Sequence, residues 1–266
     1  MKTELNLPLL VFWFSLVVLW LSVQTGALIA RHWRPLQEDE RDDFGVVITA
    51  TLTLLALIIG FSFSMAVNRY DQRKDYEEEE ANAIGTEFVR ADLLPPFERS
   101  RIRMLLMQYL DQRLLFYTTR DPSRLERIAN DTAKLQSEMW LITQRVAMAQ
   151  PNAAIALVVT GMNDVLNRQG YTQAAWWNRI PPGAWTLMFA LGICCSILVG
   201  YGRHHMGTLL FTVLPLVLSI TFFLIADIDS PRRGVIRVIP QNLISLSQSL
   251  RPATNLTRTA DVHLAK

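Results

Sequence analysis

One run of small and polar residues has the spacing needed to act on an ion. These residues recur at steps of three and four through an apolar segment and just beyond it: Thr49, Thr53, Ala56, Gly60, Ser64 and Asn68. Such steps place them on one face of a helix, while leucine, isoleucine and phenylalanine occupy the other faces. We call this face the polar stripe.

Two interpretations of the polar stripe compete. Small residues let helices approach closely, and Gly60 with Ser64 forms a small-xxx-small pair, so the stripe could be a packing seam. Alternatively, in an oligomer with this helix at its axis, the stripe would line a pore for ions. The pore-lining candidates are then Thr49, Thr53, Gly60, Ser64 and Asn68.

Charged residues follow the stripe directly. Arg69, Arg73 and Lys74 come first, and the acidic run Glu77–Glu80 comes next. On a solvated helix, Arg73–Glu77 and Lys74–Glu78 would be ordinary i,i+4 ion pairs. In an oligomer the three basic residues would instead ring a cytoplasmic mouth, followed by an acidic ring. Basic rings favour anions and acidic rings favour cations, so these residues alone do not decide the ion.

Other chemistry finds little support. The segment 68–182 has no histidine or cysteine, and the chain has no phosphate-binding glycine loop or nucleophile elbow. Three histidines, His32, His204 and His205, fall in loops expected on one side of the membrane. They could bind a metal or sense protons, but we favour ordinary pairing with nearby carboxylates. Cys194 and Cys195 are adjacent and predicted to be free thiols. We expect no enzyme, cofactor or metal site.

The composition indicates a membrane protein. Half of the residues are hydrophobic and the mean hydropathy is positive, while 26 Lys and Arg balance 24 Asp and Glu, which argues against nucleic-acid binding. Four runs approach the roughly 20 apolar residues that cross a bilayer: 7–30, 44–67, 183–201 and 207–226. The first could instead be a signal peptide, but it is long for one and begins with a single Lys2.

Basic residues near the ends of the spans set the expected orientation. On the side of both termini and the insert lie Lys2, Arg69, Arg73, Lys74, Arg179, Arg232, Arg233 and Arg237. On the other side lie Arg31, Arg34, Arg41 and Arg203. This excess places both termini and the insert in the cytoplasm of a multi-pass inner-membrane protein.

The expected fold is all-α. Residues 1–67 form the first two transmembrane helices, 68–182 a cytoplasmic helical insert, 183–226 a transmembrane hairpin and 227–266 a cytoplasmic tail. Nothing breaks the second span before Pro95-Pro96, so one helix of about 50 residues should continue into the insert, with Gly85 its weak point. Further helices begin near Phe97, at the Asp121-Pro122 cap and at Pro151. Trp176 and Trp177 are expected at the membrane interface.

The fourth span ends in Asp227-Ile228-Asp229-Ser230-Pro231-Arg232-Arg233-Gly234. Carboxylates at a helix C-terminus oppose the helix dipole, so both should have partners, for which Arg232 and Arg233 are the nearest candidates. The apolar stretch 235–250 should lie in the interface or against the bundle.

Two parts of the sequence resemble a known protein family: the second span with the residues that follow it, and the turn after the fourth span. The segments 60–64, 68–73, 80–86 and 90–95 (GFSFS, NRYDQR, EANAIGT and RADLLP) and the Asp-x-Asp-x-Pro-x-x-Gly turn resemble the signatures of a bacterial bestrophin-like family. The resemblance covers nearly the whole chain in layout. True bestrophins are pentameric anion channels with four spans, cytoplasmic termini and the second helix lining the pore. Their acidic calcium-binding cluster has no counterpart after Gly234, so calcium gating is not implied.

The leading hypothesis is therefore an oligomeric ion channel in the lipid bilayer, with an anion favoured and the second span at the axis. The alternative is a non-conducting interaction or sensor protein whose insert binds a cytoplasmic partner. A transporter is disfavoured because the halves show no internal repeat and no span is charged in its middle.

Overall fold

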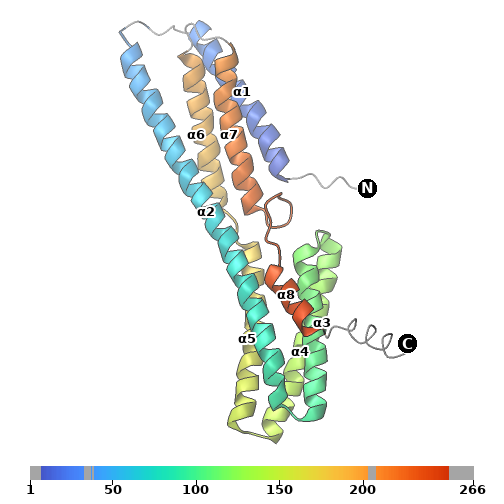
Figure 1. The fold of residues 1–266 in the computed structure, drawn as a ribbon. Coiled ribbons are helices and arrows are strands. Elements are labelled where there is room, and N and C mark those ends of the chain that lie inside the picture. Colours follow the sequence, from blue (N-terminus) through green and yellow to red (C-terminus); the bar gives the residue numbers. More distant parts are fainter. Residues whose placement is uncertain (1–6, 33–36, 38, 203–207, 252–266) are drawn as a thin grey trace, which may run out of the picture. The chain divides into compact units, whose positions relative to one another are not determined.

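A computed structural model describes residues 7–32, 37, 39–202 and 208–251, and its regular elements are helices. In chain order they are α1 (Leu7–His32), α2 (Arg41–Arg90), the short 3-10 helix η1 (Ala91–Leu93), α3 (Pro96–Thr118), α4 (Pro122–Ala149), α5 (Ala153–Trp177), α6 (Pro182–Tyr201), α7 (Thr208–Asp229) and α8 (Gln241–Leu250) (Figure 1). The prediction of one long helix through the second span is confirmed, because α2 has 50 residues. The Arg-His-His loop at 203–205 lies outside the described residues.

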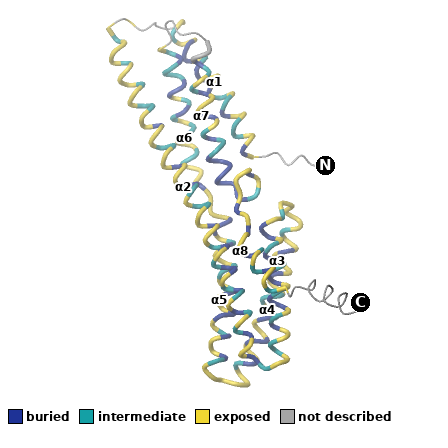
Figure 2. The backbone as a smooth tube through the Cα atoms, viewed as in Figure 1, coloured by how far each residue is buried: buried dark blue, intermediate teal, exposed yellow. Residues whose placement is uncertain are grey.

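The chain divides into two compact units. The first comprises residues 1–71 and 178–237, and the second comprises 72–177 and 238–266, so α2 begins in the first and ends in the second. In the first unit, α1 packs against α6 and α7. Its apolar core includes Leu19 of α1, Leu55 and Ala66 of α2, Met188 of α6 and Phe222 of α7. Figure 2 shows how much of the first part of α2 remains exposed compared with α6 and α7.

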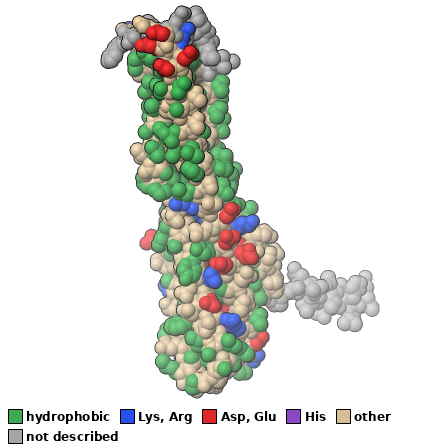
Figure 3. Space-filling model, turned by 90° about the vertical axis from the view of Figure 1, so that its left-hand side faces the viewer, with side chains coloured by type: hydrophobic (Ala, Val, Ile, Leu, Met, Phe, Trp, Pro, Cys, Tyr) green, Lys and Arg blue, Asp and Glu red, His purple; other side chains and the backbone are tan. Residues whose placement is uncertain are grey.

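Four helical stretches in the described residues are long and apolar enough to cross a membrane: Leu7–His32, Arg41–Leu93, Ala153–Tyr201 and Phe211–Asp229. In the upper part of Figure 3, hydrophobic side chains cover the visible face of the first unit. Exposed leucine, valine and phenylalanine side chains on this scale are expected where lipid replaces water as the solvent. The sidedness of these stretches, and the division into a cytoplasmic insert, stay predictions.

Helices α3, α4 and α5 form the second unit together with the end of α2 and with α8. The Asp121-Pro122 cap is confirmed, since the Asp121 carboxylate accepts the Ser123 amide at 3.0 Å. Helix α8 packs on α3, which agrees with the expectation that 235–250 lies against the bundle. A Cβ at Gly85 would lie 3.0 Å from the Leu246 Cδ1 of α8. Gly85 therefore makes room for α8 without interrupting α2.

The two tryptophans expected at the interface have different surroundings. Trp176 is buried, and its ring packs on Phe116 at 5.0 Å and on Tyr117 at 5.4 Å between centroids. Trp177 is 74% exposed. Trp176 is thus a core residue of the second unit, and the prediction of an interfacial anchor at this position is wrong.

Glycines set the distance between α1 and α6. A Cβ at Gly26 would collide with the Ile197 carbonyl, and a Cβ at Gly200 would collide with the Val23 carbonyl. Backbone atoms cannot move aside as a side-chain end can, so both positions require glycine for this approach. The packing seam that small residues offer is therefore made between α1 and α6.

Gly26→Ala should destabilise the protein, while Gly60→Ala should not. Overpacking of this kind costs about 1–3 kcal/mol. By contrast, no atom lies within 4 Å of a Cβ at Gly60, and alanine is favoured in a helix by about 1 kcal/mol. Thermal unfolding of the two variants in the same detergent measures the difference. Equal midpoints would show that the close approach of α1 and α6 is not needed.

Candidate functional site

The polar stripe lies on the exposed side of α2 in the isolated chain. All six of its residues are exposed: Thr49, Thr53, Ala56, Gly60, Ser64 and Asn68. The residues that α2 buries in the first unit are Leu55, Ser62 and Ala66. At about 100° per residue, these three lie roughly opposite the stripe. The stripe is therefore not a packing seam within one chain.

The two threonine hydroxyls of the stripe bond to backbone carbonyls of α2 itself. Thr49 Oγ1 donates to the Gly45 carbonyl and Thr53 Oγ1 to the Thr49 carbonyl, each at 2.8 Å. These bonds satisfy the donors in an apolar medium and leave oxygen lone pairs directed outward. The stripe can consequently tolerate lipid, a neighbouring helix or water and ions.

The three basic residues expected at the cytoplasmic mouth differ in how far they are exposed. Lys74 is exposed and Arg69 is half-buried, with its Nη1 atom enclosed. Arg73 is 1% exposed, and its Nε donates to the Ala175 carbonyl of α5 at 3.2 Å. Arg73 and Glu77 are both buried within the second unit, so the expectation that they lie on a solvated face of the helix is wrong.

The acidic run Glu77–Glu80 is likewise not a ring of solvated charges. Glu77 accepts the Leu243 amide at 2.9 Å and the Asn242 side-chain amide at 2.7 Å, both from α8. Glu79 pairs with Arg168 of α5 at 2.5 Å. Glu80 is buried and Glu78 is exposed.

Glu80 joins three helices of the second unit. Arg113 donates two hydrogen bonds to the Glu80 carboxylate, one from Nε and one, at 3.3 Å, from Nη2. The Tyr117 hydroxyl lies 3.4 Å away and the Thr172 hydroxyl 3.2 Å away. Both charged partners are almost fully buried. Burial would lower the pKa of Arg113, but Glu80 and the neighbouring tyrosines raise it, so Arg113 stays charged.

Sequence reasoning missed this cluster, although a signal was present. Buried residues of the second unit recur along α2 at steps of three and four: Arg73, Glu77, Glu80, Ile84 and Glu87. Arg113 extends the apolar face of α3 that contains Leu106, Tyr109 and Leu110. Residues of opposite charge on the buried faces of two helices, here Glu80 on α2 and Arg113 on α3, predict a buried ion pair.

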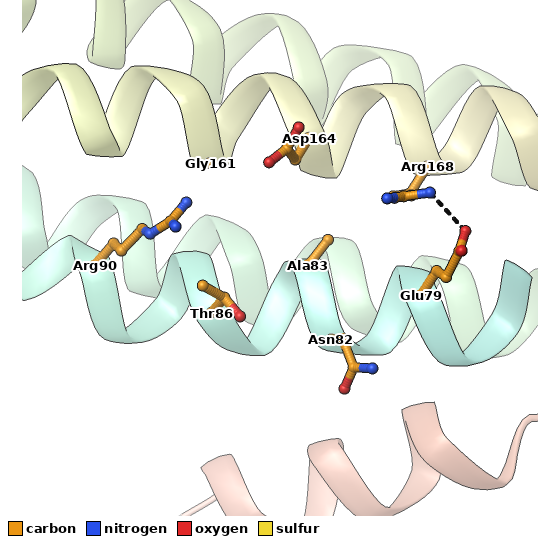
Figure 4. A pocket seen from close by; sticks show the side chains of 8 residues that line it. All are labelled: Glu79, Asn82, Ala83, Thr86, Arg90, Gly161, Asp164 and Arg168. Carbon is orange, nitrogen blue, oxygen red and sulfur yellow. Dashed lines mark hydrogen bonds and ion pairs between the residues drawn. The ribbon is translucent and has the colours of Figure 1, made fainter.

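A cavity of about 370 Å³ lies between α2 and α5 in the second unit. In Figure 4, Arg90, Thr86 and Ala83 of α2 face Gly161, Asp164 and Arg168 of α5, while Asn82 points away. Glu87 is fully buried beside it, and neither of its oxygens has a hydrogen-bond partner among the described residues. A Cβ at Gly161 would collide with Glu87 Oε2, so glycine makes room for this carboxyl group.

Burial raises the pKa of Glu87 to about 8, with Arg90 of α2 lowering it and Asp164 of α5 raising it further. The group is therefore protonated at neutral pH, when it can sit unpaired in an apolar setting. This cavity contains charges of both signs, and Arg168 of α5 forms an ion pair with Glu79 of α2 in its lining.

The two carboxylates at the end of α7, Asp227 and Asp229, accept hydrogen bonds from backbone amides. The Asp227 carboxylate accepts the amides of Val235 and Ile236, each at 2.8 Å, and Asp229 accepts the Ile180 amide at 3.1 Å. The expectation that both carboxylates have partners is confirmed, and these partners are backbone amides. A Cβ at Gly234 would collide with the Asp227 carbonyl. The Asp-x-Asp-x-Pro-x-x-Gly pattern therefore describes a turn that closes on its own backbone.

No group of three or more His, Cys, Asp or Glu side chains in the described ranges is placed to hold a metal ion. His204 and His205 fall outside those ranges. In the first unit, Cys194 is exposed and Cys195 is buried, and both are free thiols.

Glu80→Gln should unfold the second unit more readily than Glu78→Gln. Removing one charge of a buried pair leaves Arg113 uncompensated and costs about 3–5 kcal/mol, whereas an exposed substitution changes stability by about 0.5 kcal/mol or less. Thermal unfolding of the two full-length variants compares neighbouring positions with identical chemistry. A similar midpoint for both would contradict the role of the pair.

Stability should fall as pH rises from about 4.5 to about 8. The folded state keeps a proton on Glu87 in this window and the unfolded state does not, so the stabilisation present below 4.5 is lost by pH 8. The loss amounts to a few kcal/mol, since a tenfold change in proton affinity is worth about 1.4 kcal/mol. Glu87→Gln should flatten this part of the profile. An unchanged slope in the variant would assign the pH dependence elsewhere.

Comparisons with known proteins come from family models, curated sequences and solved structures. Among curated proteins, no match is found. Several solved structures match, described as crystal structures of a bacterial bestrophin homologue from Klebsiella pneumoniae with single mutations. One is 14% identical with a TM-score of 0.64, covering 91% of this chain and 97% of that one. Another is 13% identical with a TM-score of 0.63, covering 92% and 99%. At this identity the likeness shows the fold.

The family model described as a bestrophin-like domain matches residues 9–243. This range includes all but the first two residues of the helices in the first unit, together with the Glu80 cluster and the Asp227 turn. The chain belongs to the bestrophin-like family.

Proposed function

We propose that this protein is an oligomeric ion channel in which the polar stripe of α2 lines the pore. The observation that carries the proposal is the exposure of the stripe on a helix whose opposite face is buried. Lipid can cover the exposed leucines and phenylalanines of α2. A line of small and polar residues matches a water-filled axis better, and several copies around that axis would enclose it. Bestrophins provide a precedent for this arrangement.

The pore-lining residues in this proposal are Thr49, Thr53, Gly60, Ser64 and Asn68. Gly60 would give the widest point, since it adds no side chain to the lumen. The proposal keeps Lys74 and Arg69 as mouth residues. Arg73 instead serves the fold, because its guanidinium is enclosed by α5.

The charged residues that follow the stripe would influence whether the proposed pore selects anions or cations. The resemblance to bestrophins favours an anion. However, the stripe continues along α2 at steps of three and four through the exposed residues Asp71, Asp75 and Glu78, with Lys74 as the exposed basic neighbour. Acidic side chains at a pore mouth concentrate cations. The ion that this mouth favours is therefore a cation, and the expected anion preference rests on the resemblance alone.

Cysteine modification in reconstituted protein tests the pore assignment. With Cys194 and Cys195 replaced by alanine, a positively charged thiol reagent should reduce the current of Thr53→Cys by more than half. The neighbouring Leu54→Cys is the matched control, since Leu54 is also exposed but lies about 100° away around α2. It should keep its current, because its side chain faces lipid.

Mass spectrometry of the labelled protein and the reversal potential in a salt gradient complete this experiment. Equal block at both positions, or an unaffected current after complete labelling of Thr53→Cys, would contradict pore lining by the stripe. Absence of any current over a range of voltage, pH and salt would favour the non-conducting interaction protein. The sign of the reversal potential distinguishes cation from anion selectivity.

A further inference from the structure

The turn between α3 and α4 lies at one defined end of the second unit. Phe116 and Tyr117, at the end of α3, pack on Trp176, one residue before α5 ends. Arg73, at the start of the α2 portion of this unit, bonds to Ala175. The turn, at the upper end of the green helices in Figure 1, therefore lies at the end of the second unit where α2 enters the unit and α5 ends.

Three arginines surround this turn. Arg120, Arg124 and Arg127 are exposed and line a cavity of about 720 Å³ together with Leu115 and Ile128. In the described part of the chain, no ion pair is formed by any of the three guanidinium groups. The two carboxylates of the cavity have other partners: Asp121 accepts the Ser123 amide and hydroxyl, and Asp131 lies 3.4 Å from Lys134 Nζ.

The charge balance of the cavity favours an anion. Ser123 and, to a smaller extent, Arg124 lower the pKa of Asp121, which therefore stays ionised. Even so, the three arginines of the lining outnumber its two carboxylates, Asp121 and Asp131. A guanidinium group can bind two phosphate oxygens at once through parallel hydrogen bonds, and three such groups line this cavity.

We propose that this cavity binds the phosphate headgroup of an anionic phospholipid. The proposal depends on the apolar helices crossing a membrane, because the chain passes between the two units at residues 71–72 and 177–178 and the arginines lie at that end of the second unit. Basic residues close to an anionic leaflet contribute about 1 kcal/mol each. The cavity volume falls in the range of small-molecule sites, roughly 300–1,000 Å³, and Leu115 and Ile128 supply apolar surface beside the arginines.

Lipid retention by the full-length protein tests this assignment. Protein purified in a neutral detergent is mixed with phosphatidylglycerol or phosphatidylcholine, and the bound lipid is counted by native mass spectrometry. The wild type should retain phosphatidylglycerol at least fivefold more than phosphatidylcholine. Arg124→Gln should lose most of that excess, and the double variant with Arg127→Gln should lose nearly all of it.

Arg145→Gln is the matched control. Arg145 is exposed on the same helix, 21 residues further along, and therefore roughly 30 Å from Arg124. It should retain phosphatidylglycerol as the wild type does, and thermal unfolding should show that all variants are folded. Equal losses in Arg124→Gln and Arg145→Gln would replace the site with general charge attraction and overturn the proposal.

Inorganic phosphate distinguishes the lipid from a free anion. At 10 mM, phosphate should leave the retained phosphatidylglycerol within twofold of its starting value, because the lipid also contacts apolar surface. Full displacement by phosphate would identify a free-phosphate site and overturn the lipid assignment. Equal retention of phosphatidylcholine would overturn it as well. None of these readouts requires conduction, so the result is independent of the proposed channel activity.

Discussion

The charges that α2 buries hold three other helices of the second unit in place: α3, α5 and α8. A buried carboxylate or guanidinium needs a partner in nearly fixed geometry. Arg73 bonds to α5, Glu77 to α8, and Glu80 to both α3 and α5. Each of these helices is thus held to a specific position along α2 by a polar contact, and apolar packing fills the spaces between. Glu87 differs because a proton replaces the partner.

In the first unit, α2 has the opposite distribution of polar and apolar residues. There its buried residues are small or apolar, and the polar residues lie on the exposed side. A polar stripe contributes nothing to the stability of one chain, so the chain alone gives no physical reason for it. The proposed axis between copies would give such a reason, and the acidic residues that continue the stripe would then lie at the mouth of the pore.

Periodicity and breakers were sufficient to predict most of the fold. The uninterrupted pattern from Phe44 to Leu94 predicted α2 nearly to its ends, and the Asp121-Pro122 cap placed the start of α4. The interpretation of the run Glu77–Glu80 failed for a different reason. Which glutamate is buried depends on partners far along the chain: Arg113, Thr172 and Leu243 for Glu80 and Glu77. Local spacing shows the shared face but not the helix that will cover it.

The central claim is that the polar stripes of neighbouring copies face one another. Spin labels at Gly60 and, separately, at the adjacent exposed Phe61 test it through the distances between copies in the membrane. A stripe at the axis predicts a shorter distance for labels at Gly60 than for labels at Phe61. The reverse order, or no dipolar coupling between copies at either position, would contradict the account.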